Sequence, residues 1–395
     1  MIRKIKADNL FTGTEMLGNN KVLITKSSGE IIEIIDEENA GEDVEIFRGI
    51  ISPGFINTHC HLELSHMKGL IPEKTGLIDF VYKVVNERHF AEEEILHAID
   101  EAENEMLLNG IVAVGDICNN LLTLPQKLKE KLSYYNFIEA SGWLPDISAL
   151  RFERALHIYE EFKIQNSKFK IQNSIVPHAP YSVSNDLWKL ITPYFENNTV
   201  TIHNQETSFE DELFTKGSGD FIKMYEMMKI DNSFHMPSKM SSLQTYFSKL
   251  SKAASIILVH NTFTSMDDIK FAMENKKDDQ QLSFCVCINA NLYIENTIPP
   301  IEILMNSNCS IVIGTDSLAS NHSLNLLDEM KTIQKYFPDI SLATMLQWAT
   351  VNGAKALHMN DTLGSFENGK IPGIVLIENT DGLTLDNNST SKKIL

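Results

Sequence analysis

The sequence has no apolar run long enough to cross a bilayer, and its first ten residues lack the apolar segment of a secretory signal. It contains five cysteines and no Cys-x-x-Cys pair, so we expect reduced thiols rather than a disulfide framework. Positive charge is scarce, because 34 Lys and Arg stand against 53 Asp and Glu, a net charge of −19. That charge would repel nucleic acid phosphates and anionic membranes. We therefore expect a cytoplasmic protein that acts on a small molecule, with neither a nucleic acid polymer nor a membrane as partner.

The chain has enough apolar material for a large core, since its 395 residues are 43% hydrophobic and 22% charged. Short apolar runs that end in polar residues alternate with longer helical patterns, as in βα units around a parallel sheet. We expect strands at 54–61, 111–116, 134–140, 174–178, 199–203, 255–260, 282–289 and 310–316. Eight strands with helical crossovers predict an α/β fold, a (β/α)8 barrel of the TIM type.

The two ends of the chain follow a different pattern, with short β-rich pieces such as 22–25, 30–35 and 373–377 separated by Gly and Asn turns. We expect residues 1–52 and 362–395 to form a small composite β-sandwich domain and residues 53–361 to form the barrel. Residues beyond about 380 are polar and are expected to fray.

The first barrel strand carries two imidazoles one residue apart, His59 and His61. Alternate side chains of a strand share a face, so the two rings would point into one cavity while Cys60 faces the other way. Two convergent imidazoles suggest half of a metal site. Alone the pair is weak evidence, because an HxH sequence can arise by chance.

Three further strand ends carry residues that could ligate a metal, namely His203, His260 and Asp316. In a (β/α)8 barrel the chemistry lies at the carboxyl ends of the strands, so these side chains are expected to converge with the HxH pair. Imidazoles and one carboxylate would give a divalent metal a mixed set of ligands with room for water. A single histidine at a strand end is more often a hydrogen-bonded core residue, but agreement among four strand ends favours a metal site.

These motifs resemble those of the amidohydrolase superfamily, in the cytosine/adenosine deaminase-like branch that includes S-adenosylhomocysteine deaminases and chlorohydrolases. The resemblance extends from residues 53–57 to the Gly-containing stretch at 364–370 and includes Val176 to Ser182 and Gly314 to Asn321. One departure is the segment from Cys287 to Asn291, where the family usually has Cys-Pro-x-Ser-Asn. It puts the contacts of the seventh-strand loop in doubt.

The resemblance implies a role for each candidate site residue. It implies one divalent metal ion, with zinc as first choice and iron or manganese as alternatives, because the chain has His178 where two-metal members carry a carboxylated lysine. The implied metal ligands are His59, His61, His203 and Asp316; the implied substrate contact is His178; and the implied catalytic residues are Glu206, His260 and Asp316.

The resemblance also indicates a hydrolytic deamination. In this hypothesis Asp316 accepts the proton of the attacking water, His260 hydrogen-bonds the hydroxide, and Glu206 protonates the ring and then the leaving amine. The alternative for Glu206 is a surface carboxylate at the start of a helix, since Asp211 and Glu212 follow it.

The stretch from His61 to His66 resembles aminodeoxyfutalosine deaminases, so an adenine nucleoside with an acidic or aromatic 5′ substituent is the leading substrate, with Glu63 as a candidate for its ribose hydroxyls. Alternatives are a chlorohydrolase, a cyclic amide hydrolase and a non-catalytic scaffold. Branch members often dimerise, so a homodimer is possible. Residues 209–250 are expected to form either a substrate lid or a subunit contact.

Overall fold

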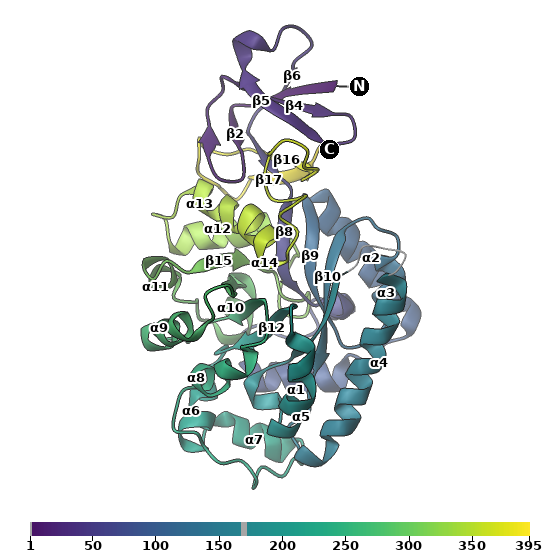
Figure 1. Cartoon of the computed structure of the whole chain (residues 1–395), viewed down its shortest axis with the longest axis vertical. Helices are drawn as coiled ribbons and strands as arrows, with labels where there is room; N and C mark the ends of the chain where they lie inside the picture. The colour runs from purple at the N-terminus through teal and green to yellow at the C-terminus, as the bar shows by residue number, and fades with distance from the viewer. Residues whose placement is uncertain (1, 167–171) are drawn as a thin grey trace.

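The computed structural model describes residues 2–166 and 172–395, and its core is built on eight parallel strands (Figure 1). Two four-stranded sheets have the orders β11-β10-β9-β8 and β12-β13-β14-β15. Their strands are β8 (Phe55–Cys60), β9 (Ile111–Cys118), β10 (Ser133–Ala140), β11 (Gln172–Pro177), β12 (Thr199–Asn204), β13 (Ser255–His260), β14 (Gln281–Val286) and β15 (Ser310–Ile313). All eight expected strands are therefore present.

The two sheets meet along both of their edges. At one edge the amides of Thr315 and Asp316 donate to the carbonyl of His59, at 3.0 and 3.1 Å, and join β15 to β8. At the other edge the amide of His203 donates to the carbonyl of His178 at 3.0 Å and joins β12 to β11. The apolar side chains of both sheets belong to one buried cluster. The strands thus surround a common core, as the predicted TIM-type barrel requires.

Helices connect the strands. They are α1 (Leu77–Glu87), α2 (Glu92–Leu108), α3 (Leu124–Lys127), α4 (Ser148–Asn166), α5 (Asn185–Ile191), α6 (Phe209–Lys216), α7 (Asp220–Met227), α8 (Ser242–Tyr246), α9 (Met266–Asn275), α10 (Ile288–Glu295), α11 (Ile301–Asn306), α12 (Leu326–Tyr336), α13 (Leu342–Gln347) and α14 (Gly353–Ala356). Gly110 follows α2 with a φ of +94°, and a Cβ there would lie 2.5 Å from Val375 Cγ2. Only glycine fits that turn. No helix of the described residues is long and apolar enough to span a bilayer.

Two expected strands extend too far. The strand predicted at 282–289 ends at Val286, and Asn289 lies in α10, where its amide donates to Glu329 Oε2 at 3.1 Å. The strand predicted at 310–316 ends at Ile313, and Asp316 has a φ of +57°. After Val286 the apolar sequence continues through Cys287 and Ile288 but the backbone turns into α10. After Ile313 the backbone turns at Gly314, Thr315 and Asp316, and the Asp316 carboxylate contacts His59 and His61.

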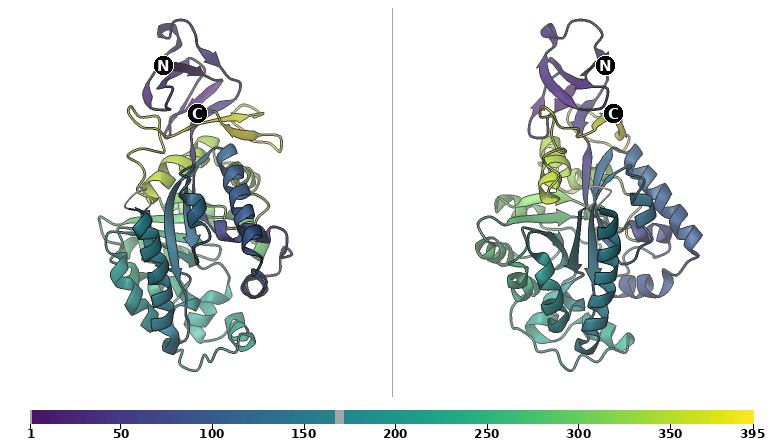
Figure 2. Two further views of the ribbon diagram at one scale, coloured as in Figure 1. Left: turned by 90° about the vertical axis from the view of Figure 1, so that its right-hand side faces the viewer. Right: turned by 45° about the vertical axis from the view of Figure 1, so that its right-hand side comes forward.

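Two small sheets lie above the barrel in the view of Figure 1, and one of them joins strands from both ends of the chain (Figures 1 and 2). One sheet contains β5-β4-β1-β6 and the other β17-β16-β7-β2-β3. The strands are β1 (Ile2–Lys6), β2 (Asn9–Phe11), β3 (Met16–Leu17), β4 (Lys21–Lys26), β5 (Ile31–Asp36), β6 (Glu45–Ile46), β7 (Ile50–Pro53), β16 (Ile374–Glu378) and β17 (Thr390–Lys393).

The prediction that residues beyond about 380 fray is wrong. Strand β17 pairs antiparallel with β16, and the amide of Ile394 donates to the carbonyl of Ile374 at 2.8 Å. Ser391 Oγ donates to the carbonyl of Asn109 at 2.9 Å, and Leu385 is buried in the main core. Backbone pairing and a few buried side chains hold this polar segment, which composition alone does not reveal.

Candidate active site

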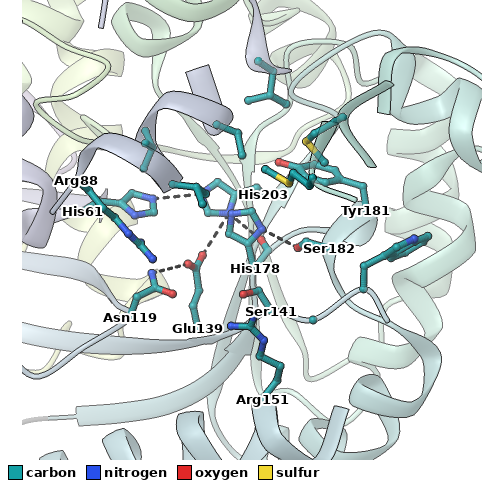
Figure 3. Close-up of a pocket in the computed structure, with 18 of the residues that line it drawn as sticks. His61, Arg88, Asn119, Glu139, Ser141, Arg151, His178, Tyr181, Ser182 and His203 are labelled. Carbon is teal, nitrogen blue, oxygen red and sulfur yellow. Dashed lines mark hydrogen bonds and ion pairs between the residues drawn. The ribbon is translucent and has the colours of Figure 1, made fainter. Parts of the chain in front are cut away.

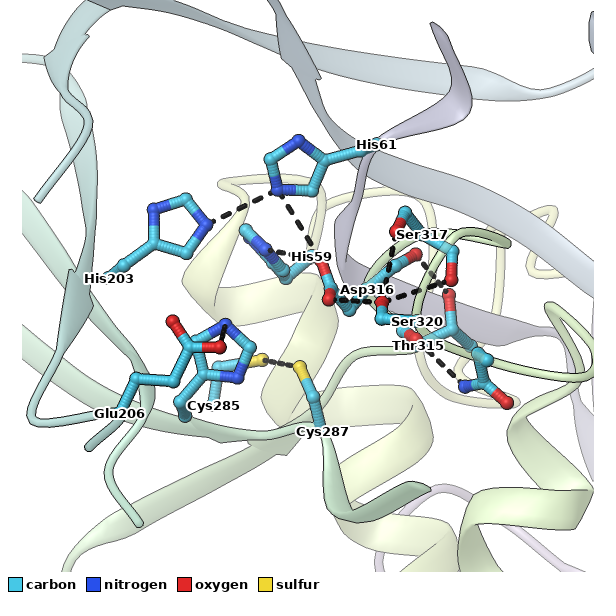
Figure 4. A network of polar contacts seen from close by, with 12 residues as sticks. His59, His61, His203, Glu206, Cys285, Cys287, Thr315, Asp316, Ser317 and Ser320 are labelled. Carbon is cyan, nitrogen blue, oxygen red and sulfur yellow. Dashed lines mark hydrogen bonds and ion pairs between the residues drawn. The ribbon is translucent and has the colours of Figure 1, made fainter. Parts of the chain in front are cut away.

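The two histidines of β8 converge as the strand pattern predicts. His59 and His61 have ring centroids 4.9 Å apart, and Cys60 packs into the main core on the opposite face. His203 from the end of β12 brings its Nε2 to 3.2 Å from His61 Nε2. Three imidazoles from two strands therefore face one point (Figure 4).

Asp316 completes this cluster from the turn after β15. Its Oδ1 lies 3.5 Å from His59 Nε2 and 3.4 Å from His61 Nε2. Its Oδ2 accepts a hydrogen bond from Ser320 Oγ, which fixes the carboxylate (Figure 4). The four predicted metal ligands thus lie together at the carboxyl ends of the strands.

The protonation states of the cluster fit a divalent cation. Burial lowers the pKa of His61 to about 3, so its imidazole is neutral and can act as a ligand. Although burial acts in the opposite direction, the contact with His59 and the charges of nearby imidazoles hold the pKa of Asp316 well below its ordinary value. Neither ring nitrogen of His59, a fully buried residue, makes a hydrogen bond among the described residues. A buried imidazole whose ring nitrogens make no hydrogen bond is destabilising by itself and is expected in a metal site.

The outer hydrogen bonds orient the imidazoles. His203 Nδ1 lies 2.7 Å from the carbonyl of His178, which leaves Nε2 for the cluster. His260 Nδ1 lies 2.9 Å from Asn291 Oδ1, so His260 Nε2 faces Glu206 Oε1 at 3.7 Å. Asn291 therefore makes a defined contact at the site, although it lies in the segment that departs from the family pattern.

Glu206 lies inside the molecule, not on its surface. The residue is 4% exposed, and burial, together with the charge of Asp316, raises the pKa of its carboxyl well above the ordinary value. The preceding residue, Gln205, has a φ of +44°, and its amide donates to Glu210 Oε1 at 3.1 Å. This turn directs Glu206 toward His260, at 3.7 Å, and excludes the surface alternative. Figure 4 shows Glu206 beside the group of His59, His203 and Asp316.

A cavity of about 580 Å³ opens beside the cluster, and seven of the eight predicted site residues line it. They are His61, Glu63, His178, His203, Glu206, His260 and Asp316. Helices α1 and α7 supply apolar wall, with Phe80 and Val84 from α1 and Met224 and Tyr225 from α7. The segment 209–250 thus contributes to the pocket through α7.

The two predicted substrate contacts lie on the same cavity. His178 Nδ1 lies 2.7 Å from Ser182 Oγ, and burial lowers the pKa of His178 to about 4. Glu63 accepts a hydrogen bond from the amide of Asn119 at 3.0 Å, and burial raises its pKa to about 7. His178 is therefore uncharged near neutral pH, whereas Glu63 is divided between its protonated and ionised forms there.

The structure also places four residues in the cavity that the sequence interpretation missed: Arg88, Glu139, Arg151 and Arg154. Figure 3 shows the first three of them. Glu139 occupies the end of the third predicted strand, so the strand-end argument that selected His203 could have selected it. The three arginines lie near or within helices, where no local pattern shows which face borders the cavity.

Comparison with known proteins agrees with this geometry. A family model described as the amidohydrolase family matches residues 50–393. An adenosine deaminase of Helicobacter pylori is 27% identical over 318 residues, 79% of this chain and 75% of that protein. An aminodeoxyfutalosine deaminase of Nitratiruptor sp. is 27% identical over 350 residues, 85% of this chain and 80% of that protein. The crystal structure of Helicobacter pylori aminofutalosine deaminase with methylthio-coformycin superposes with a TM-score of 0.80 at 22% identity, over 97% of this chain and 93% of that one.

Proposed function

Because the chain belongs to the amidohydrolase family, we propose that it is a metal-dependent deaminase that releases ammonia from the adenine ring of a nucleoside. The observation that carries this proposal is the buried, protonatable Glu206 facing a cluster of three imidazoles and a carboxylate across one cavity. The relatives named above, which act as deaminases, support the same reaction class.

The residues that would hold the metal are His59, His61, His203 and Asp316. We propose one ion, zinc in the first place, since nitrogen and oxygen ligands also suit iron or manganese. When bound, such an ion makes a water molecule acidic enough to attack an electron-poor ring carbon at neutral pH.

The protein side chains move the protons. Asp316 accepts a proton from the attacking water, and His260, fixed by Asn291, hydrogen-bonds that water from the other side. Glu206 donates its proton to the ring nitrogen as the ring carbon becomes tetrahedral, takes up the proton that Asp316 removed from the water, and passes it to the leaving amine. The hydroxyl proton released as the C=O bond forms then restores Glu206. Its raised pKa keeps this proton available near neutral pH.

The test is Glu206→Gln, which preserves size but cannot deliver a proton. We expect ammonia release from an adenine nucleoside to fall by roughly 100-fold or more, while the metal content measured by mass spectrometry stays at the wild-type value. An unchanged rate on an adenine nucleoside would remove the proton shuttle. It would favour chlorohydrolysis or cyclic amide hydrolysis on the same site.

We also propose that the substrate carries an anionic group on its 5′ side. The chain has five arginines, and three of them, Arg88, Arg151 and Arg154, line the cavity. None of the three forms an ion pair with any described residue, although acidic residues outnumber basic ones by 19. Unpaired guanidinium groups beside an apolar wall favour a carboxylate or another anion that is attached to an apolar group.

The arginines are tested with Arg151→Met, which keeps an apolar stem and removes the charge. We expect KM for an adenine nucleoside with a 5′ carboxylate to rise about tenfold, and KM for 5′-deoxyadenosine to stay within about twofold. Arg48→Met, at an exposed arginine in the bend between β6 and β7, is the matched control. An equal change in KM for both nucleosides would contradict the proposed anionic 5′ group.

At the level of architecture, we propose that residues 1–52 and 362–395 form one composite β domain beside a barrel of residues 53–361. The pairing of β16 with β7 supports this proposal, because it joins the two ends of the chain. A shared apolar cluster that includes Ile5, Leu23, Ile374 and Leu376 also supports it.

A further inference from the structure

Glu139, at the end of β10, has a buried oxygen without a hydrogen-bond partner. Its Oε2 accepts from Asn119 Nδ2 at 2.9 Å. Its Oε1 accepts no hydrogen bond from any described residue, and the side chain is 2% exposed. His203 Nδ1 lies 3.4 Å from this oxygen but already meets the carbonyl of His178 at 2.7 Å. A buried acceptor without a donor is destabilising, so we expect this oxygen to accept a hydrogen bond from a ligand.

Asn119 joins Glu139 to a second carboxyl of the same wall. The amide of Asn119 donates to Glu63 Oε2 at 3.0 Å, and Glu63 is 3% exposed. Both carboxyls line the cavity. Figure 3 shows Glu139 with Asn119 and His203. Glu139 lies outside the group of His59, His61 and Asp316. In each carboxyl, Oε2 accepts a hydrogen bond from Asn119, and Oε1 can accept one from another donor.

A second metal ion does not fit this place. His203 lies next to Glu139, but its Nδ1 contacts the carbonyl of His178 and its Nε2 faces His61. His178 Nδ1 contacts Ser182 Oγ, so only His178 Nε2 remains. One carboxylate oxygen and one remaining imidazole nitrogen are too few ligands for a protein metal site. Glu63 and Glu139 instead bind the same asparagine, Asn119, so their carboxyl groups lie near each other. Such a pair matches two neighbouring hydroxyl donors, because carboxylates accept hydrogen bonds from ribose hydroxyls.

We infer that Glu139 is a specificity-determining residue that, together with Glu63, binds the vicinal 2′ and 3′ hydroxyls of a ribose. This inference rests on the proposed nucleoside substrate and adds the group that selects a ribonucleoside. The adenine ring then lies toward Glu206 and the metal cluster, and the ribose lies against the wall formed by β10 and the turn after β8.

The experiment compares an adenine ribonucleoside with its 2′,3′-dideoxy analogue in wild-type protein and in Glu139→Gln. The amide oxygen of the variant can still accept from Asn119, but its NH2 group replaces the acceptor Oε1. For the ribonucleoside we expect KM to rise roughly 10- to 100-fold with kcat nearly unchanged. For the dideoxy analogue we expect little change, since wild-type protein already binds it weakly. Equal effects on both compounds, or none, would overturn the inference.

Two control measurements accompany Glu139→Gln. Glu103→Gln removes a buried carboxyl of α2 that does not line the cavity, and we expect it to leave the preference for ribose intact. The metal content of zinc-loaded protein should be equal in wild type and Glu139→Gln. Loss of one ion per chain in Glu139→Gln would assign the carboxyl to a second metal and would overturn the inference.

A failure of the proposed function is distinguishable. If wild-type protein releases no ammonia from any adenine nucleoside, deamination is wrong, and the ribose site is then tested by calorimetric titration of zinc-loaded protein with the two compounds. A preference for the ribonucleoside that Glu139→Gln abolishes would support the site. Equal affinities in wild-type protein would contradict it.

Discussion

Lys127 and Asp116 form an ion pair with no exposure to solvent, at an Nζ–Oδ2 distance of 2.5 Å. Asp116 Oδ1 also accepts from the amide of Leu62 at 2.8 Å, directly after His61. Lys127→Met would leave a buried carboxylate without its counter-charge. We expect the free energy of unfolding, measured in urea, to fall by about 3–5 kcal/mol.

The double variant Asp116→Asn/Lys127→Met removes both charges and is expected to recover much of that loss. Wild-type stability in Lys127→Met alone would show that the pair contributes nothing.

A second prediction at the residue scale concerns pH. Burial, with smaller contributions from Asp211 and Glu206, raises the pKa of Glu210 to about 8, against an ordinary value of 4.5. Between these pH values the unfolded chain releases a proton that the folded chain retains, so the free energy of unfolding falls as pH rises. Glu210→Gln removes this contribution. When the pH is raised from about 5 to about 8, the free energy of unfolding of the variant, measured in urea, should rise relative to wild type by more than about 1 kcal/mol.

Glu210→Gln isolates the effect of the titrating proton, because the side-chain oxygen of the variant can keep both donors of Glu210 Oε1. These donors are Ser242 Oγ and the backbone amide of Gln205. Glu210 Oε2 has no partner among the described residues, so the new NH2 group displaces no donor. A stability difference that stays constant with pH would contradict the prediction.

The site residues that the sequence predicts lie at or near the ends of strands. His59, His61, His203, His260 and Asp316 stand at or just after strand ends, and the barrel geometry brings all strand ends to one face. The arginines reach the cavity through tertiary packing, which no local spacing encodes. The roles assigned to the predicted residues remain predictions until the variants are measured.

At the scale of elements, the seam between β15 and β8 depends on Gly314. A Cβ at this position would lie 2.8 Å from His59 Cβ and 2.9 Å from Cys285 Sγ. Gly314→Ala should therefore push His59 out of place. We expect a loss of about 1–3 kcal/mol in unfolding free energy and a lower zinc content after gel filtration.

Gly18→Ala is the matched control, since the one atom near its Cβ would be Asn20 Oδ1 at 3.9 Å. It should change stability by less than about 0.5 kcal/mol. Full zinc content and wild-type stability in Gly314→Ala would contradict the importance of this seam.

Apolar runs predicted the strands well because a barrel strand is buried on both faces and reads as continuous apolar sequence. The same signal extended two predicted strands too far. Apolar residues continue at Ile288 into α10, and Asp316 lies outside the strand, where its carboxylate contacts His59 and His61. The polar segment of β17 gave no apolar signal, and its order comes from pairing with β16.

At the scale of the whole molecule, charge is distributed unequally, because an acidic protein concentrates three of its five arginines at one cavity. Association of two copies stays a prediction taken from the family resemblance. Light scattering should give twice the chain mass of 44.6 kDa. A single-chain mass at micromolar concentration would contradict a homodimer and leave the cavity as described.

The most direct test of the proposed deamination is ammonia release by zinc-loaded protein, with and without a chelator. The panel would hold adenosine, 5′-deoxyadenosine, aminodeoxyfutalosine, guanine, cytosine and a chloro-triazine. We predict chelator-sensitive turnover of an adenine nucleoside, fastest for one with an anionic 5′ group. Turnover that survives metal removal, or none on any adenine nucleoside with zinc bound, would contradict the proposed deamination.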